Sequence, residues 1–151
     1  APVAAPKAAP AAAPKAAAPA ASAGSVKVTA GAAGKVFKVE ASVGQAVKAG
    51  DFLFASGQLG INPATGKLPD GAAAQAEQSL KNVGAILQDA GVSYDDVVKT
   101  TVYLSNMNDF GAVNAVYASF FKKTLPARSC VEIGKLPMNG DVEVEVVAYC
   151  K

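Results

Sequence analysis

Two segments near the C-terminal end of the sequence alternate between two kinds of side chain. Residues 126–133 (Pro-Ala-Arg-Ser-Cys-Val-Glu-Ile) predict a β-strand that begins at Pro126. Residues 141–149 predict a second strand, in which Val142, Val144, Val146 and Ala148 alternate with Glu143, Glu145 and Val147. Alternation with a period of two residues requires a sheet with one apolar face, so the rest of the chain must cover that face.

A turn separates these two segments, because residues 135–140 contain a proline, an asparagine and a glycine. We therefore predict a hairpin in which Glu132 lies opposite Glu143 and Cys130 lies opposite Glu145. The polar face of this hairpin carries Arg128, Cys130, Glu132, Glu143 and Glu145. Such a face is usually solvated. The alternative is that it lines a pocket built around Arg128.

The preceding sequence predicts two helices with a strand between them. Residues 71–90 have apolar side chains at helical spacing, with Asp70 as the candidate N-cap and Gly91 as the end. Residues 96–104 predict a strand, and residues 109–122 predict a second helix that is capped by the segment 106–109. The side chains expected to face the core are Ala76, Leu80, Val83, Leu87 and Ala90 in the first helix and Phe110, Val113, Tyr117, Phe120 and Phe121 in the second. With two opening strands, the order β-β-α-β-α-β-β predicts an α+β fold with both helices on one face of the sheet.

Composition excludes several classes of protein. The chain has 151 residues, enough for one domain, and a net charge of +2 gives no electrostatic reason to expect nucleic acid or a membrane as a partner. No apolar run is long enough for a transmembrane helix, and the first 25 residues lack the apolar region of a signal peptide. There is no histidine, and the two cysteines lack metal-ligand spacing, so we expect no metal, no imidazole base and a reducing, cytoplasmic setting.

The N-terminal part differs in composition from the rest. Residues 1–25 consist largely of Ala and Pro, which predicts a flexible linker. Residues 26–43 contain two short alternating runs around a Gly-Ala-Ala-Gly break, which predicts a pair of strands.

From about residue 44 to residue 151 the chain resembles the reactive intermediate deaminase A (RidA, also YjgF) family. The matching motifs are Ser56-Gly57-Gln58, Lys99-Thr-Thr-Val102, Asn108-Asp-Phe110, Val113-Asn114 with Tyr117, and Pro126-Ala-Arg-Ser-Cys-Val-Glu132. Several motifs in the right order are far more specific than one short pattern. The resemblance implies a chorismate-mutase-like sheet with two helices on one face, assembled as a homotrimer.

Residues 1–50 resemble the Ala/Pro linker and the first half of a biotin carrier domain. The biotinylated Met-Lys-Met hairpin of that family is absent, so we expect no biotin. Two interpretations stay open for residues 26–43: a truncated carrier fused onto a deaminase body, or a divergent first strand. The tyrosine-containing opening of the RidA family is also replaced, by Ser42-Val43-Gly44-Gln45-Ala46.

The RidA resemblance implies hydrolysis of 2-imino acids, or their enamine tautomers, to 2-keto acids and ammonia without a cofactor. It assigns the grip on the substrate carboxylate to Arg128 and the positioning of a water molecule to Glu143. It makes Ser56, Gly57, Asn114 and Cys130 pocket residues, although each also suits a structural role. In the predicted hairpin Arg128 lies four residues beyond Glu132, on the order of 13 Å at ~3.3 Å per residue. We therefore expect the two catalytic residues to come from neighbouring subunits.

Three other functions compete with the deaminase. A trimer of the same family that binds small molecules or acts as a chaperone without turnover is favoured by the missing tyrosine. A ribonuclease or translation inhibitor lacks a basic patch and an aromatic platform in the sequence. A biotin carrier fragment lacks the lysine that would be modified.

Overall fold

A computed structural model describes residues 46–150 of the chain. The linker expected at 1–25, the strands expected at 26–43 and the replaced opening up to Gln45 lie outside the described residues. Within residues 46–150 the strands are β1 (Ala46–Ala49), β2 (Phe52–Leu59), β3 (Val97–Leu104), β4 (Ala127–Glu132) and β5 (Val142–Tyr149). The α-helices are α1 (Ala72–Asp89) and α2 (Phe110–Phe120).

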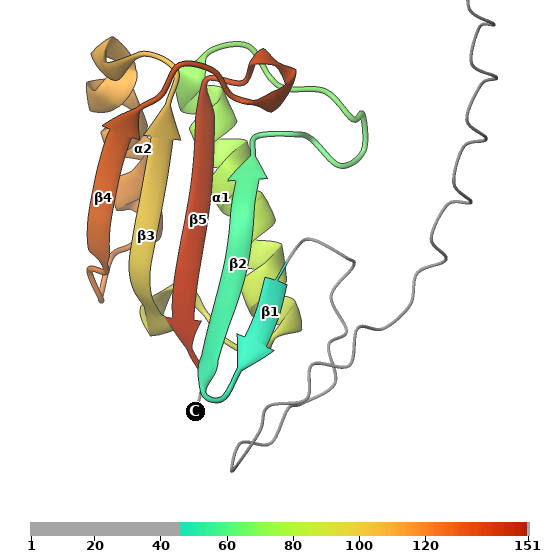
Figure 1. Cartoon of the computed structure of the whole chain (residues 1–151), viewed down its shortest axis with the longest axis vertical. Coiled ribbons are helices and arrows are strands. Elements are labelled where there is room, and N and C mark those ends of the chain that lie inside the picture. The colour runs from blue at the N-terminus through green and yellow to red at the C-terminus, as the bar shows by residue number, and fades with distance from the viewer. Residues whose placement is uncertain (1–45, 151) are drawn as a thin grey trace, which may run out of the picture.

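The five strands form one mixed sheet in the order β1-β2-β5-β3-β4. Neighbouring strands are antiparallel except β3 and β4, which are parallel. Both helices pack on the same face of the sheet and leave the opposite face open (Figure 1). The predicted α+β fold with two helices on one face is therefore confirmed.

The core lies between this sheet and the helices, and the alternation in β5 supplies its centre. Val142, Val144, Val146 and Ala148 are each at most 1% exposed, as the pattern predicted. Leu80, Val83 and Leu87 of α1 are equally buried against them. Because β5 has a hydrogen-bonded strand on both sides and helices above it, its inner face excludes water completely.

The predicted hairpin between the last two strands is wrong. β5 pairs with β2 and β3, whereas β4 pairs only with β3. A parallel pair needs a long crossover, and α2 supplies it between β3 and β4. The segment 133–141, anchored by the buried Leu136, then passes from β4 across the end of the sheet to β5 (Figure 1). Turn composition identified this connection as a loop but carried no information on which strand its end would pair with.

The helix ends agree with the sequence only in part. Gly71, with a φ of 86°, precedes α1, and no side chain caps it, so the prediction of an Asp70 cap is wrong. Gly91 does end the helix, because its φ of 75° lets the N–H groups of Gly91 and Val92 bond back to the carbonyls of Gln88 and Leu87. Asn106 acts as a cap through its side chain, which accepts a hydrogen bond from the Asn108 N–H.

Burial of the sheet by the helices gives a direct stability test. Leu104 is fully buried and Leu125 is 78% exposed. We expect Leu104→Ala to lower the free energy of unfolding by about 2–5 kcal/mol, because it removes apolar burial and leaves a cavity. The matched variant Leu125→Ala should change it by less than about 0.5 kcal/mol. Urea titrations at one protein concentration measure both, and equal losses would contradict this placement of the core.

Candidate active site

Arg128 lies on β4 and points toward α2. Its Nη1 donates a hydrogen bond of 2.7 Å to Oδ1 of Asn114. The centre of its guanidinium lies 4.6 Å from the centroid of the Tyr117 ring and 5.6 Å from that of the Phe110 ring. A cation held over aromatic faces is stabilised by their quadrupoles, so these two rings and one amide fix the direction of the guanidinium.

The Tyr117 ring beside Arg128 is itself fixed by a hydrogen bond to a buried residue of β3. The Tyr117 hydroxyl and the Thr100 hydroxyl lie 2.8 Å apart in a hydrogen bond, and Thr100 is completely buried. Burial raises the pKa of Tyr117, an effect that the bond to Thr100 and the charge of Arg128 only partly oppose. The phenol therefore stays neutral at physiological pH and serves as a fixed surface for the guanidinium.

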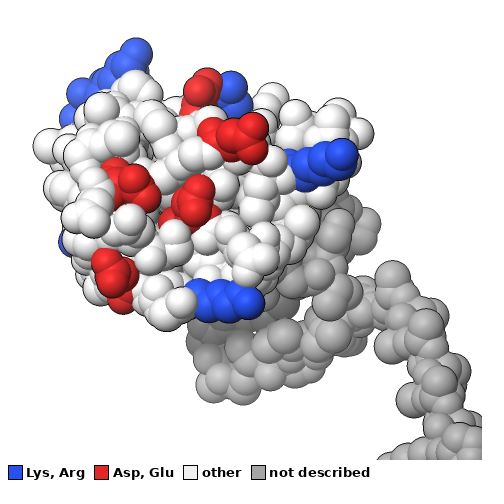
Figure 2. Space-filling model, turned by 90° about the horizontal axis from the view of Figure 1, so that it is seen from above, with Lys and Arg blue, Asp and Glu red and all other residues white. Residues whose placement is uncertain are grey.

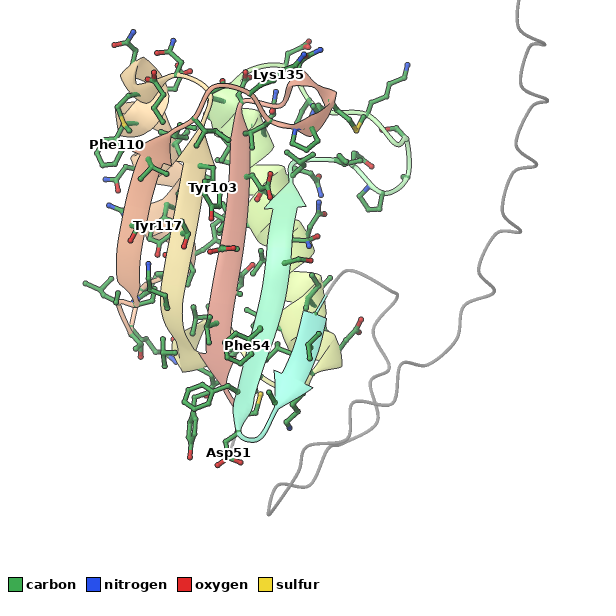
Figure 3. All side chains as sticks on the ribbon, viewed as in Figure 1. Asp51, Phe54, Tyr103, Phe110, Tyr117 and Lys135 are labelled. Atoms are coloured by element: carbon green, nitrogen blue, oxygen red, sulfur yellow. The ribbon has the colours of Figure 1, made fainter. Side chains whose placement is uncertain are left out.

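The role of two aromatic residues beside Arg128 was not predicted from the sequence. Phe110 and Tyr117 were both predicted to face the core, but Phe110 is 37% exposed and lies beside Arg128 at the edge of the sheet (Figure 3). The available signal was their spacing with Asn114, since residues at i, i+4 and i+7 share one helix face. That spacing shows a common face, but it does not reveal that an arginine from another element lies against it.

Cys130 follows Arg128 on the same side of β4. It is half-buried against the core. Burial raises the pKa of its thiol, and the nearby charge of Arg128 lowers it to a smaller extent. A thiol held in its protonated form is a poor nucleophile, so this residue suits lining a pocket better than attacking a substrate.

A second group of site residues gathers around Glu143 on β5. A Cβ atom placed on Gly57 would lie only 1.7 Å from Oε1 of Glu143, so the carboxylate rests directly on the backbone of β2. The register of β2 against β5 shifts between Ala55 and Gln58, and this bulge brings Ser56 and Gly57 to that position. The structure thus brings Gly57 and Glu143, two of the predicted site residues, into contact, and Ser56 precedes Gly57 on the same strand.

The electrostatic surroundings of Glu143 favour its protonated form. Burial raises the pKa of Glu143, and the negative charge of Glu145 raises it further. Tyr103, the cross-strand partner of Glu143, also has a raised pKa, caused first by burial and then by Glu145. The carboxyl group therefore exchanges its proton at a higher pH than an ordinary glutamate, which suits acid–base chemistry.

Arg128 and Glu143 lie on opposite faces of the sheet. Thr100 pairs in register with both Arg128 and the buried Val146, which places Arg128 on the helix side. Tyr103 pairs with Glu143, which places that carboxylate on the open side, two strands or about 10 Å across the sheet from β4.

The predicted single polar face with Arg128, Cys130 and three glutamates is therefore wrong. Its error follows from the wrong hairpin. Glu132 lies on the helix side with Arg128, and its carboxylate accepts a hydrogen bond of 2.6 Å from the Met107 N–H. This bond stabilises the turn before α2, which is a structural role for Glu132. Within one chain, no small substrate can contact both Arg128 and Glu143.

The part of the chain from 46 to 150 offers few other reactive arrangements. No three side chains of the Cys, Asp and Glu types come together there as a metal site would require. Neither described α-helix has both the length and the apolar character needed to cross a bilayer.

Comparison with known proteins gives a consistent result. The sequence model of the family described as endoribonuclease L-PSP matches residues 33–150. A relative from Escherichia coli K12, named 2-iminobutanoate/2-iminopropanoate deaminase, is 49% identical over 107 residues, which are 69% of this chain and 84% of the relative.

Two solved structures from Escherichia coli have the same fold. The crystal structure of the YjgF gene product has a TM-score of 0.69 at 46% identity and covers 71% of this chain and 87% of its own. The structure described as TdcF with bound serine has a TM-score of 0.69 at 41% identity, with the same two coverages. Because the family model matches well over half of the sequence and the relatives share its fold, the chain belongs to the endoribonuclease L-PSP family, which includes the RidA and YjgF proteins.

Proposed function

We propose that this protein hydrolyses 2-imino acids such as 2-iminobutanoate and 2-iminopropanoate, or their enamine tautomers, to 2-keto acids and ammonia. The observation that carries the proposal is the fixed guanidinium of Arg128, supported by Tyr117 and bonded to Asn114. A planar guanidinium held in one direction is suited to bind a carboxylate through two parallel hydrogen bonds. The name of the 49% identical relative and the serine bound to TdcF support the same class of ligand.

The proposed reaction needs one oriented water molecule. Glu143 accepts a proton from this water as the water oxygen bonds to the carbon of the C=N group, and it passes that proton to the nitrogen to give a carbinolamine. Glu143 then accepts the proton of the new hydroxyl group and delivers it to the nitrogen, so that the carbon–nitrogen bond breaks, ammonia leaves and the carbonyl forms. Ser56 and Gly57 supply a hydroxyl and a backbone N–H to the substrate, and Cys130 lines the pocket beside Arg128. No cofactor, metal, nucleic acid or membrane takes part.

The complete site requires a neighbouring subunit, and we propose a homotrimer. Arg128 and Glu143 face away from each other in one chain, so a pocket that contains both must lie between chains. The open face of the sheet also exposes large apolar side chains that need cover, including Val47, Phe52, Phe54, Val131 and Tyr149, each 39–49% exposed. In a closed ring of three chains, the open face of every chain is covered and three identical pockets form between neighbouring chains.

Surface charge and the cysteines support the other proposed properties. On the end of the molecule seen in Figure 2, acidic side chains lie toward the middle and basic ones lie near the rim, so this end has no continuous basic surface for nucleic acid. Both cysteines of the chain, Cys130 and Cys150, are free. Free thiols favour a reducing compartment, which supports a cytoplasmic location.

Loss of the guanidinium should abolish turnover. We expect Arg128→Ala to lower kcat/KM for 2-iminobutanoate about 100-fold or more, since it removes about 3 kcal/mol of charge-assisted hydrogen bonding. The substrate is generated in situ from threonine by a threonine dehydratase, and ammonium and 2-ketobutyrate are measured. Lys123→Ala, which removes a charge from an exposed ion pair with Asp95, is the control and should match wild type. Equal activity of the two variants would rule out the carboxylate grip.

The raised pKa of Glu143 gives a pH test with a defined sign. Activity of the wild type should fall as pH decreases through this raised pKa, because the protonated carboxyl cannot accept a proton from water. Glu145→Gln removes the neighbouring negative charge, so it should move this fall to lower pH, while Glu143→Gln should lower kcat by about 100-fold or more at all pH values. A profile of kcat against pH measures the shift. An unchanged profile in Glu145→Gln would contradict the role of Glu143.

Mixing two inactive variants tests the shared pocket. Arg128→Ala subunits retain Glu143, and Glu143→Gln subunits retain Arg128. After random exchange between the two, roughly one quarter of the interfaces in a closed ring should contain both wild-type residues, so about a quarter of wild-type activity should return. The quarter applies to the unseparated mixture, whereas mixed trimers isolated through a different affinity tag on each variant should recover about one third. Mixed trimers without recovered activity would show that the two residues do not act in the same pocket.

A further inference from the structure

The helix side that faces the sheet carries three polar residues among its apolar ones. Gln75, Ser79 and Asn82 follow one another at i, i+4 and i+7 along α1, and we refer to them as the polar stripe. Gln75 is 5% exposed and Ser79 is fully buried. A buried polar side chain destabilises the fold unless it is hydrogen-bonded, and each member of the stripe is bonded to a segment of the sheet or its loops.

Ser79 and Asn82 of the polar stripe bond to the end of β2 and to the segment that follows it. The Ser79 hydroxyl donates a hydrogen bond of 2.7 Å to the carbonyl of Gln58. The Asn82 amide donates to the carbonyls of Leu59 and Ile61, at 3.0 and 2.9 Å. Gln58 directly follows Gly57 at the bulge, where the regular register with β5 is interrupted. The helix therefore fixes the backbone that carries Gly57 where the register of the sheet is interrupted.

Gln75, the remaining member of the polar stripe, bonds to the residue that precedes β5. Nε2 of Gln75 donates to the Asp141 carboxylate at 2.9 Å, and the Asp141 N–H donates to Oε1 of Gln75 at 2.7 Å. This reciprocal pair of bonds lies two residues before Glu143. The chain also approaches the helix closely after β2, since a Cβ atom on Gly60 would lie 2.4 Å from the Gln75 carbonyl oxygen.

We propose that Gln75 and Ser79 are positioning residues that set the placement of the Glu143 carboxylate on Gly57. Ser79 is hydrogen-bonded to β2, and Gln75 is hydrogen-bonded to Asp141 at the start of β5. The two residues lie one turn apart on the same helix. Loss of the hydrogen bonds of either residue shifts the end of β2 relative to the start of β5. The Glu143 carboxylate then moves away from the water molecule that it activates in the proposed reaction. The inference rests on the proposed hydrolysis and deepens it, because it assigns the geometry of the acid–base group to buried side chains that never contact the substrate.

The variant Gln75→Glu tests the tie to β5 with almost no change in shape. At neutral pH it places a second carboxylate against Asp141, and at lower pH its protonated form again has a donor for Asp141. We expect kcat at pH 7.5 to fall about tenfold or more while KM changes little, because small misplacements of a catalytic group have large effects on rate. The ratio of variant to wild-type kcat should rise again as pH is lowered. Gln88→Glu, the same substitution on the exposed side of α1, should leave kcat unchanged.

The variant Ser79→Ala tests the tie to β2 and gives a measurement that does not depend on turnover. It removes only the hydroxyl that bonds Gln58. An NMR pH titration of glutamate carboxyl carbons in the intact protein should show the pKa of Glu143 moved toward its ordinary value, because the released carboxylate becomes more solvated. Glu143→Gln identifies the signal.

These outcomes separate the two hypotheses. Wild type that does not accelerate hydrolysis would refute the proposed function, and the titration of Glu143 would then decide the positioning role alone. Folded assemblies of Gln75→Glu and Ser79→Ala that retain the wild-type kcat, pH profile and Glu143 titration would overturn the positioning role, whether or not the enzyme is active.

Discussion

The burial of β5 at the centre of the sheet is the constraint on which the other features depend. Four of its side chains are completely enclosed between α1 and the strands on either side. A strand with such an apolar inner face is most stable when it has partners on both edges and a helix above it. Once β5 occupies this position, β4 is displaced to the edge, and its only partner is β3.

The position of β5 also decides where the reactive groups lie. The central strand presents Glu143 to the open face and against Gly57 of its neighbour, while the edge strand presents Arg128 to one side of α2. The same alternation that buries the valines exposes the glutamates, so burial and chemistry share one strand. In the proposed function a single chain therefore holds two half-sites that face in opposite directions, and the proposed trimer unites them between subunits.

The two half-sites are held in place by different physical means. Arg128 is fixed by aromatic faces and one amide, an arrangement that leaves donors of the guanidinium free to meet a carboxylate. Glu143 is fixed by close contact with a glycine and by a carboxylate neighbour, which restricts hydration and raises its pKa. One half-site thus favours an anion, and the other favours proton exchange. Hydrolysis of an imino acid requires both properties.

The sequence by itself determined the element types, the buried face of β5, the apolar stripe of α1 and the identity of the family. These features depend on local spacing, since a period of 2 or 3.6 residues specifies which side chains share a face whatever the partner is. It also indicated Arg128 and Glu143 as reactive residues, but only through the resemblance to a known family.

Only the tertiary structure decided which strands pair and therefore which face each reactive residue occupies. Pairing depends on which strand is most stable at the central, most buried position of the sheet. The spacing of apolar side chains within one segment does not contain this information. The prediction of a hairpin between residues 126–133 and 141–149 was wrong for this reason, although the alternation within residues 141–149 was assigned correctly. The support of Arg128 by Tyr117 and the ties from Gln75 and Ser79 likewise join residues from separate elements, so they appear only when the chain has folded.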